Sequence, residues 1–176
     1  RWIEQTDNYN NTGGDSLVIW YNTSPTERLK ISYFLKKYNT SNDMYLGREV
    51  IENPKVKNSY GMGMKRNCER YRNQRNCVPQ MIVPFVTDFQ VVFKDVNGNE
   101  LRPVCGSDSC SSVGRDNQSK VHTAEVYLTV RSPNPINKTQ KKYRIVNDNR
   151  DQTLPPDNYH RETFYISVYL RNIVKI

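Results

Sequence analysis

Apolar and polar residues alternate along several stretches of this chain, most regularly close to its C-terminal end. Over residues 163–171 the apolar positions are Phe164, Ile166, Val168 and Leu170, and the positions between them are Thr163, Tyr165, Ser167, Tyr169 and Arg171. Successive side chains of a β-strand point to opposite faces of its sheet, so this period of two predicts a half-buried strand. A chain that repeats the pattern is expected to fold around a sheet.

Alternation, and over residues 17–22 a dense apolar run, predict further strands along the chain. Strands are expected over residues 17–22, 29–36, 44–51, 86–93 (approached by 82–85) and 124–130, with shorter ones over 101–104 and 143–146. Asn97-Gly98 lies between two apolar runs and predicts a two-residue hairpin turn. Residues 52–79, 106–120 and 132–160 are expected to be long loops. The predicted fold class is mainly β: an antiparallel sheet with long loops, in a single domain that spans residues 1–176.

The first residues follow a different pattern. Residues 1–11 are predicted to be the end of a helix, with Trp2, Ile3 and Glu4 as its last turn, and the loop composition of residues 10–14 follows. The chain contains no apolar stretch of the roughly 18–20 residues that a membrane span needs.

Composition narrows the class of protein further. Aromatic residues make up 11% of the chain, which argues against wholesale disorder, although only 36% of the residues are hydrophobic. Lysine and arginine number 26 against 18 aspartates and glutamates, so the formal net charge is +8. This sign favours anionic partners such as nucleic acid, lipid headgroups or acidic proteins. Membrane channels, coiled coils and collagen-like fibres are excluded.

Four cysteines form two local pairs, Cys68 with Cys77 and Cys105 with Cys110. Each pair brackets a polar loop, which favours two short-range disulfides among the three pairings that four cysteines allow. A zinc site is the alternative. However, paired zinc ligands are commonly separated by about two to four residues, and eight residues separate Cys68 from Cys77. Disulfides imply an oxidising compartment, either the periplasm or the outside of the cell.

A basic cluster surrounds the first cysteine pair. Its members are Lys65, Arg66, Arg70, Arg72 and Arg75. Together with Tyr71, these side chains are candidates for contact with an anion or with the phosphate backbone of DNA. The favoured interpretation is a disulfide-tethered surface loop whose charges are solvated or paired with acidic residues of a neighbouring subunit.

Residues suited to catalysis are few. His122 and His160 are the only histidines, and oxidised cysteines cannot serve as thiolate nucleophiles. Ser107, Asp108 and Ser109 lie within the second cysteine loop, where a solvated turn explains them. The known short motifs of hydrolases, metalloproteases, P-loop proteins and dinucleotide-binding proteins do not occur. We therefore expect a protein that is not an enzyme and has no cofactor.

A second polar group resembles a calcium loop only in composition. Asp95, Asn97, Asn99 and Glu100 offer oxygen ligands, but the twelve-residue pattern with its closing glutamate is missing. A hairpin turn explains the same residues without a metal, and no metal site is expected.

Three passages, in this order, resemble the PilW-type minor pilins of type IV pili, which are relatives of the J-type minor pseudopilins of type II secretion. Residues 14–21 (GDSLVIWY) are similar to the family's first strand, and residues 83–91 (VPFVTDFQV) to its central segment. Residues 161–172 (RETFYISVYLRN) are similar to its terminal signature, and residues 124–131 occupy the place of its strand that ends in arginine. Together they cover most of the chain outside the two long loops.

The resemblance implies an antiparallel pilin head domain with long, disulfide-stapled loops, and an α+β protein once the N-terminal helix is included. Pilins carry that hydrophobic helix with a glutamate near its start, and only residues 1–11 would remain of it here. The implied function is that of a structural subunit that, with other minor pilins, primes pilus assembly and sits at the pilus tip. The implied location is the inner membrane and periplasm before assembly, with membrane contact only through the helix, and the extracellular pilus afterwards.

The expected partners are other minor pilins, with a tip adhesin and the major pilin as further candidates. Two alternatives stay open. One is a J-type minor pseudopilin of type II secretion, which is the same kind of subunit in another machine. The other is a DNA-capturing module of a competence pilus, suggested by the net charge and by the basic residues between Lys65 and Arg75.

Overall fold

The computed structural model describes residues 2–6, 14–22, 27–38, 43–54, 65–66, 80–101, 120–147 and 150–170. Every regular element in this part of the chain is a β-strand, so the predicted mainly β fold is confirmed. In chain order the strands are β1 (Trp2–Thr6), β2 (Ser16–Asn22), β3 (Glu27–Lys37), β4 (Met44–Pro54), β5 (Lys65–Arg66), β6 (Gln80–Lys94), β7 (Glu100–Leu101), β8 (Thr123–Arg131), β9 (Lys141–Asn147), β10 (Arg150–Asp157) and β11 (Arg161–Tyr169).

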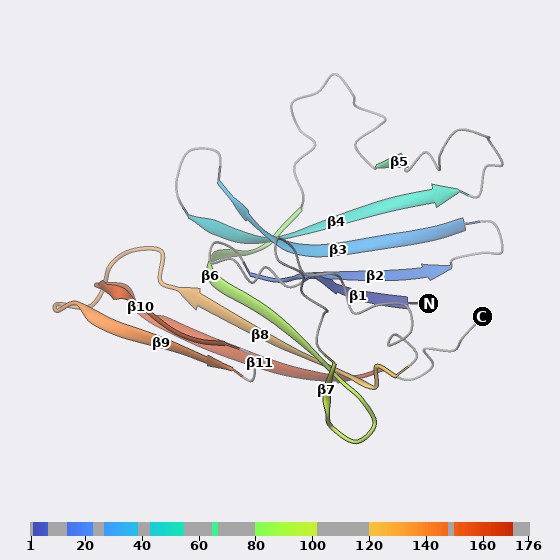
Figure 1. Cartoon of the computed structure of the whole chain (residues 1–176). Coiled ribbons are helices and arrows are strands. Elements are labelled where there is room, and N and C mark those ends of the chain that lie inside the picture. Colours follow the sequence, from blue (N-terminus) through green and yellow to red (C-terminus); the bar gives the residue numbers. More distant parts are fainter. Residues whose placement is uncertain are drawn as a thin grey trace, which may run out of the picture.

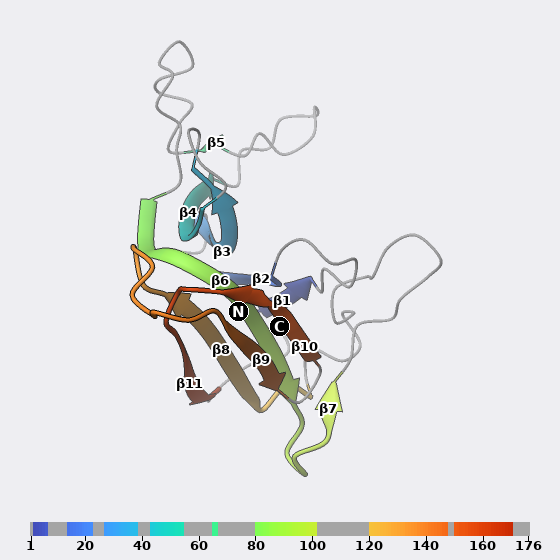
Figure 2. The same ribbon diagram turned by 90° about the vertical axis from the view of Figure 1, so that its left-hand side faces the viewer.

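One antiparallel sheet holds all of these strands except β9 and β10. Its order is β1-β2-β3-β4-β6-β8-β11, with β5 beside β4 and β7 beside β6, so neighbouring strands follow one another along the chain. Strands β9 and β10 pair with each other as a separate hairpin. In the sequence this hairpin lies between β8 and β11. The sheet curls, and Figure 1 shows β1–β4 above the plane formed by β6, β8 and β11. Turned by 90°, the same curl brings β6 across the middle of the molecule (Figure 2).

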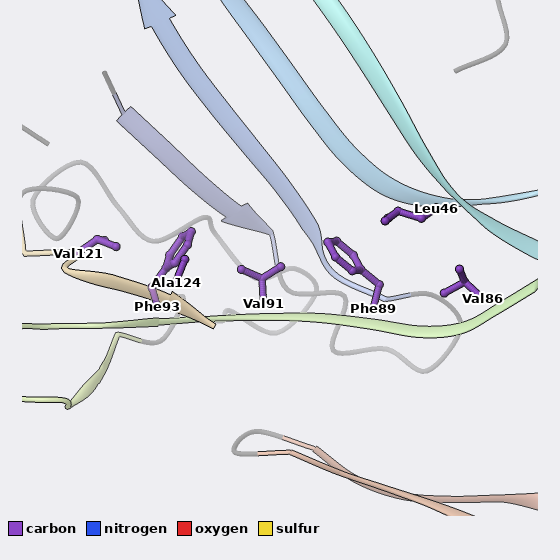
Figure 3. Packing of buried hydrophobic residues seen from close by; sticks show 7 residues of the cluster. All are labelled: Leu46, Val86, Phe89, Val91, Phe93, Val121 and Ala124. Atoms are coloured by element: carbon purple, nitrogen blue, oxygen red, sulfur yellow. The ribbon is translucent and has the colours of Figure 1, made fainter. Parts of the chain in front are cut away.

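The hydrophobic core lies inside this curl, on one face of β6 and β8. Val91 and Phe93 are fully buried and Phe89 is 2% exposed. Their side chains point towards β1–β4, and the β9–β10 hairpin lies on the opposite side of β6 (Figure 3). Partly buried side chains of β2 and β3 pack against this cluster from above. One face of β6 and β8 is thus covered by the other half of the same sheet, and over residues 88–93 the opposite face of β6 is buried as well.

Strand β6 bends where it passes from β4 to β8. Phe85 has a φ of 53°, a left-handed conformation that costs a bulky residue about 1–3 kcal/mol. The pairing register shifts on both sides of this residue, against β4 between Met44 and Gly47 and against β8 between Val86 and Asp88. These bulges turn the strand so that it joins both halves of the curl.

Strand β4 pairs with β6 only as far as Val86. Beyond this point Gly14 and Asp15 lie along the same edge of β6. The Asp15 N–H donates to the Phe89 carbonyl at 2.7 Å, and the Val91 N–H donates to Asp15 Oδ2 at 2.8 Å. Gly14 lies so close that a Cβ atom there would stand 2.3 Å from the Phe89 oxygen. The short Gly-Asp segment thus replaces a strand over two residues of β6.

The hairpin between β6 and β7 differs in detail from the predicted two-residue turn. The Gly98 N–H donates to the Asp95 carbonyl at 3.1 Å and the Asp95 N–H to the Asn99 carbonyl at 2.9 Å, which leaves a three-residue loop. Gly98 takes the left-handed position with φ of 82°, as such loops require. The Asp95 carboxylate accepts hydrogen bonds from the Asn97 and Asn99 N–H groups and from the Asn99 side chain. Chiefly through the bond from the Asn99 side chain, these contacts lower the pKa of Asp95.

Two segments differ more strongly from expectation. The helix end predicted at Trp2–Glu4 is wrong: β1 pairs antiparallel with β2, from Trp2 opposite Trp20 to Thr6 opposite Ser16. Within the loop predicted over 132–160, the structure contains β10 as well as the expected short strand, here β9. Pro155 and Pro156 fall where the β9–β10 register shifts, between Leu154 and Asp157. Prolines are tolerated at such irregularities because no ladder donor is needed there.

Candidate functional site: the edge strand β11

Strand β11 exposes large apolar and aromatic side chains on both of its faces. Tyr165 and Tyr169 are 53% and 57% exposed on one face, and Phe164, Ile166 and Val168 are 43–59% exposed on the other. The second group shares its face with the core, because Phe164 lies opposite Leu128, Ile166 opposite Val126 and Val168 opposite Ala124. Only Leu170, just beyond the strand, is among the residues that pack against the core cluster. The covering half of the sheet thus shields β6 and β8 but not β11.

β11 is also an edge. Among the strands that the structure describes it pairs with β8 alone, over all nine of its residues. Two backbone hydrogen bonds define which groups of β11 face β8. The Leu170 N–H donates to the His122 carbonyl, and the Ser132 N–H donates to the His160 carbonyl, both at 2.8 Å. N–H and C=O groups of a strand alternate in direction, so the even-numbered residues of β11 face β8. The odd-numbered residues, including Thr163, Tyr165 and Ser167, direct their backbone groups to the outer edge.

Side-chain contacts hold this edge in place from the face opposite the core. The Thr163 hydroxyl is 2.8 Å from the Thr129 hydroxyl and 2.9 Å from the Tyr143 hydroxyl of β9. The Tyr165 hydroxyl donates to Glu125 Oε1 at 3.1 Å, and its ring lies 5.0 Å from that of Tyr127.

Glu125 connects this contact to the interior of the sheet. Its other oxygen, Oε2, accepts from the Tyr127 hydroxyl at 3.1 Å and lies 2.8 Å from Lys94 Nζ of β6. Glu125 is 8% exposed, so its charge is neutralised where it is buried. The odd-numbered face of β11 is therefore anchored by polar bonds, while its even-numbered face is apolar and open from Phe164 to Val168.

Two arginines stand directly opposite each other where β8 ends and β11 begins. Arg131 and Arg161 are cross-strand partners. Each is neutralised by its own carboxylate: Arg161 binds Asp157 through both oxygens, and Arg131 forms an ion pair with Asp43 from the turn between β3 and β4. The bonds from Arg161, above all, lower the pKa of Asp157, and the nearby charge of Arg131 lowers it further. Like charges opposite each other would otherwise destabilise the pair.

Aromatic rings complete this arginine cluster. The Arg131 guanidinium lies 3.9 Å from the centre of the Tyr159 ring and 5.5 Å from that of Phe85, at the bend of β6. The cluster therefore ties the end of β10, the start of β11 and the bend of β6 together, and both arginines act structurally.

The residues singled out from the sequence fall mostly elsewhere. Cys68, Cys77, Cys105 and Cys110 lie outside the described residues, as do Arg70, Arg72 and Arg75 and the loop with Ser107, Asp108 and Ser109. Lys65 and Arg66 are described in their backbone, where they form β5 opposite Glu52 and Ile51. The disulfides and the anion contact therefore stay predictions.

The histidines lie at opposite ends of β8. His122 precedes the strand and contacts the Tyr169 ring at 4.1 Å between ring centres, and the His160 carbonyl pairs with Ser132 beyond the other end. No group of three histidine, cysteine, aspartate or glutamate side chains in the described part of the chain is arranged to hold a metal ion. The same part contains no helix long and apolar enough to cross a membrane.

Sequence reasoning predicted β11 but not its exposure. The available signal was its charge: from Thr163 to Leu170 the sequence contains no charged residue. Natural edge strands usually carry charged side chains that block pairing with other chains, whereas β11 carries charge only at its first two residues, Arg161 and Glu162. Comparison of the chain with protein-family models, with curated proteins and with solved structures gave no match.

Proposed function

We propose that this protein is a non-catalytic structural subunit that works by docking to other proteins, and that it is a minor pilin of the PilW type. In this role it joins other minor pilins in a complex that primes assembly of a type IV pilus and remains at the tip. The observation that carries the docking role is β11, an edge strand of nine residues that exposes apolar side chains on the face it shares with the core.

The pilin assignment rests on the resemblance, and the contacts of the resembling passages support it. Asp15, from the first passage, hydrogen-bonds Phe89 and Val91 of the second, so two segments more than 70 residues apart meet in the fold. Arg131 and Arg161, which belong to the remaining two passages, form the arginine cluster. Residues that make such contacts stabilise the fold, so the members of a family could share them for structural reasons and not because of a common catalytic activity.

Strand β1 does not fit the resemblance, so the structural support for the pilin assignment comes from the rest of the sheet. The resemblance implies a helix end at residues 1–11, whereas Trp2–Thr6 pair with β2. The proposal therefore depends on residues 14–172 and on the exposed strand, and helix packing within a filament plays no part in the argument.

The test is deletion of the gene in a piliated host, combined with co-purification of the chain with candidate minor pilins. Loss of surface pili and of twitching, restored by the intact gene, is the expected result. Normal piliation together with defective protein secretion would instead indicate the J-type pseudopilin. Retained pili with loss of DNA uptake, and salt-sensitive binding of duplex DNA that is abolished when the arginines of the basic cluster are replaced by alanine, would indicate the DNA-capturing module.

A further inference from the structure

We propose that β11 is completed in the working assembly by an extended segment of a different protein, which adds to the sheet as an antiparallel strand. The segment alternates apolar and polar residues and carries acidic residues where it passes the N-terminal end of β11. This inference rests on the proposed docking function and specifies its mode and the chemistry of the partner.

The backbone of β11 suits addition of a strand. Its odd-numbered residues direct N–H and C=O groups outward in a row, and the bonds to Tyr143 and Glu125 hold the strand in place before any partner arrives. Strand addition gains affinity from main-chain hydrogen bonds and specificity from alternate side chains. The inward-facing side chains of an added strand would cover the exposed faces of Phe164, Ile166 and Val168 and extend the core.

The exposed area argues against a second copy of this chain as the occupant. Buried aromatic side chains cover about 150–250 Å² each, so the exposed parts of the five large side chains of β11 amount to on the order of 400 Å². A stable dimer interface buries about 800 Å² on each partner. Pairing of two β11 strands would fall short of that area, whereas a single extended segment needs only the edge.

Charge points the same way. Two copies would each bring a net charge of +8 and repel one another. Near the N-terminal end of β11, Lys138 and the β9 residues Lys141 and Lys142 are exposed, and Lys141 lies opposite Asp157, the residue that binds Arg161. These three lysines outnumber Glu162, the exposed acidic residue of β11 at this end. In an antiparallel partner, the C-terminal end of the segment reaches this region. Acidic residues at that end would be attracted there.

The experiment uses the intact chain, labelled with ¹⁵N, and three end-capped synthetic peptides. The probe is TVTVTVTED; the controls are TVTVPVTED, whose proline cannot continue the ladder, and TVTVTVTKK, whose charge is reversed. The expected result is that the probe shifts the amide signals of residues 161–169 and slows hydrogen exchange of the Thr163, Tyr165 and Ser167 amides at least about tenfold. The proline peptide should cause no such change, and the lysine peptide should bind at least about fivefold more weakly at low salt.

Two variants test the register. Ser167→Pro removes an outward N–H and should abolish peptide binding while leaving the fold intact, because that group does not pair with β8. Ser167→Ala, its matched control, should bind the probe like the original chain. Ile166→Lys gives a second route to the same loss, since it places a charge on a side chain that is already 59% exposed.

The outcomes separate cleanly. Signal changes confined to other residues, equal binding of all three peptides, or unchanged binding by both Ser167→Pro and Ile166→Lys would overturn the proposal. Concentration-dependent dimerisation through β11 without peptide, lost in Ser167→Pro, would overturn it in favour of a second copy. If the peptides fail to bind while the chain still co-purifies with minor pilins, the strand-addition mode is wrong and the docking function stands. If the probe peptide binds but deletion of the gene leaves pili intact, strand addition stands and the proposed pilin function is wrong.

Discussion

Replacement of Gly14 by alanine should strongly destabilise the fold, although the residue lies outside every strand. A Cβ atom at this position would lie 2.3 Å from the Phe89 carbonyl oxygen, 2.8 Å from its nitrogen and 2.9 Å from its Cβ. Two of these three atoms belong to the backbone of a buried residue in the middle of β6, so no side-chain rotation relieves the clash. The segment around Gly14 must move away from β6.

That movement sets the magnitude. It breaks the hydrogen bond from Asp15 to the Phe89 carbonyl, which contributes about 1 kcal/mol. It also leaves the N–H of Val91, a fully buried residue, without Asp15 Oδ2, at a cost of about 1–3 kcal/mol. The free energy of unfolding should therefore fall by about 3 kcal/mol, which for a chain of this size lowers the midpoint of thermal unfolding by about 6–12 °C.

The assay is urea and thermal unfolding followed by circular dichroism, with Gly98 as the matched position. Gly98 has φ of 82° and open space around its Cβ position, so Gly98→Ala tests backbone strain alone and should cost about 1–2 kcal/mol. Gly98→Asn, which tolerates the left-handed conformation, should change stability by less than about 0.5 kcal/mol. A Gly14→Ala variant as stable as Gly98→Asn would refute the proposed role of residues 14–15.

Three further predictions follow from the core, the arginine cluster and the edge. Phe93→Ala should lower the free energy of unfolding by about 3–5 kcal/mol in the same urea assay, because it empties a site with no exposure to solvent. The pKa of Asp157 is lowered in the folded protein, so its ion pair with Arg161 stabilises the fold above a pH of about 4, and this stabilisation is lost as the pH falls through the lowered pKa. The variant Asp157→Asn should therefore show a weaker dependence of the unfolding free energy on pH in that range. In the free chain, amide hydrogen exchange at Thr163, Tyr165 and Ser167 should be at least about tenfold faster than at the even-numbered residues between them, and uniform exchange along β11 would contradict the assigned register.

Sequence patterns were a good guide to the long strands of the sheet. The predicted strands over 17–22, 29–36 and 124–130 match β2, β3 and β8 closely. A dense apolar run indicated the first of them, and a period of two indicated the other two. The bend of β6 was beyond such reasoning. Phe85 takes its left-handed conformation only because β4 and β8 demand different registers on either side of it, and no local pattern encodes a constraint from two distant strands.

The errors have equally specific causes. Trp2–Thr6 became a strand because β2 offers a free edge, and pairing with a neighbour overrides weak local preferences. Strand β10 was missed because Pro155 and Pro156 suggested a loop, whereas they occupy an irregularity in the pairing with β9. Exposure of β11 could not be read from alternation, since a period of two predicts which residues share a face but not whether another layer covers that face.

The same distinction explains why β11 is suited to binding. Its even-numbered residues are as apolar as those of a covered strand, yet the layer that shields β6 and β8 ends before it. Pairing with β8 along its full length, together with the bonds from Tyr165 to Glu125 and from Thr163 to Tyr143, already fixes its conformation. A partner strand would therefore lose only its own conformational freedom on docking, which lowers the ordering cost of strand pairing. An edge that carries no charge from Thr163 to Tyr169 favours aggregation when it is left open, so its persistence is best explained if the assembled protein keeps it covered.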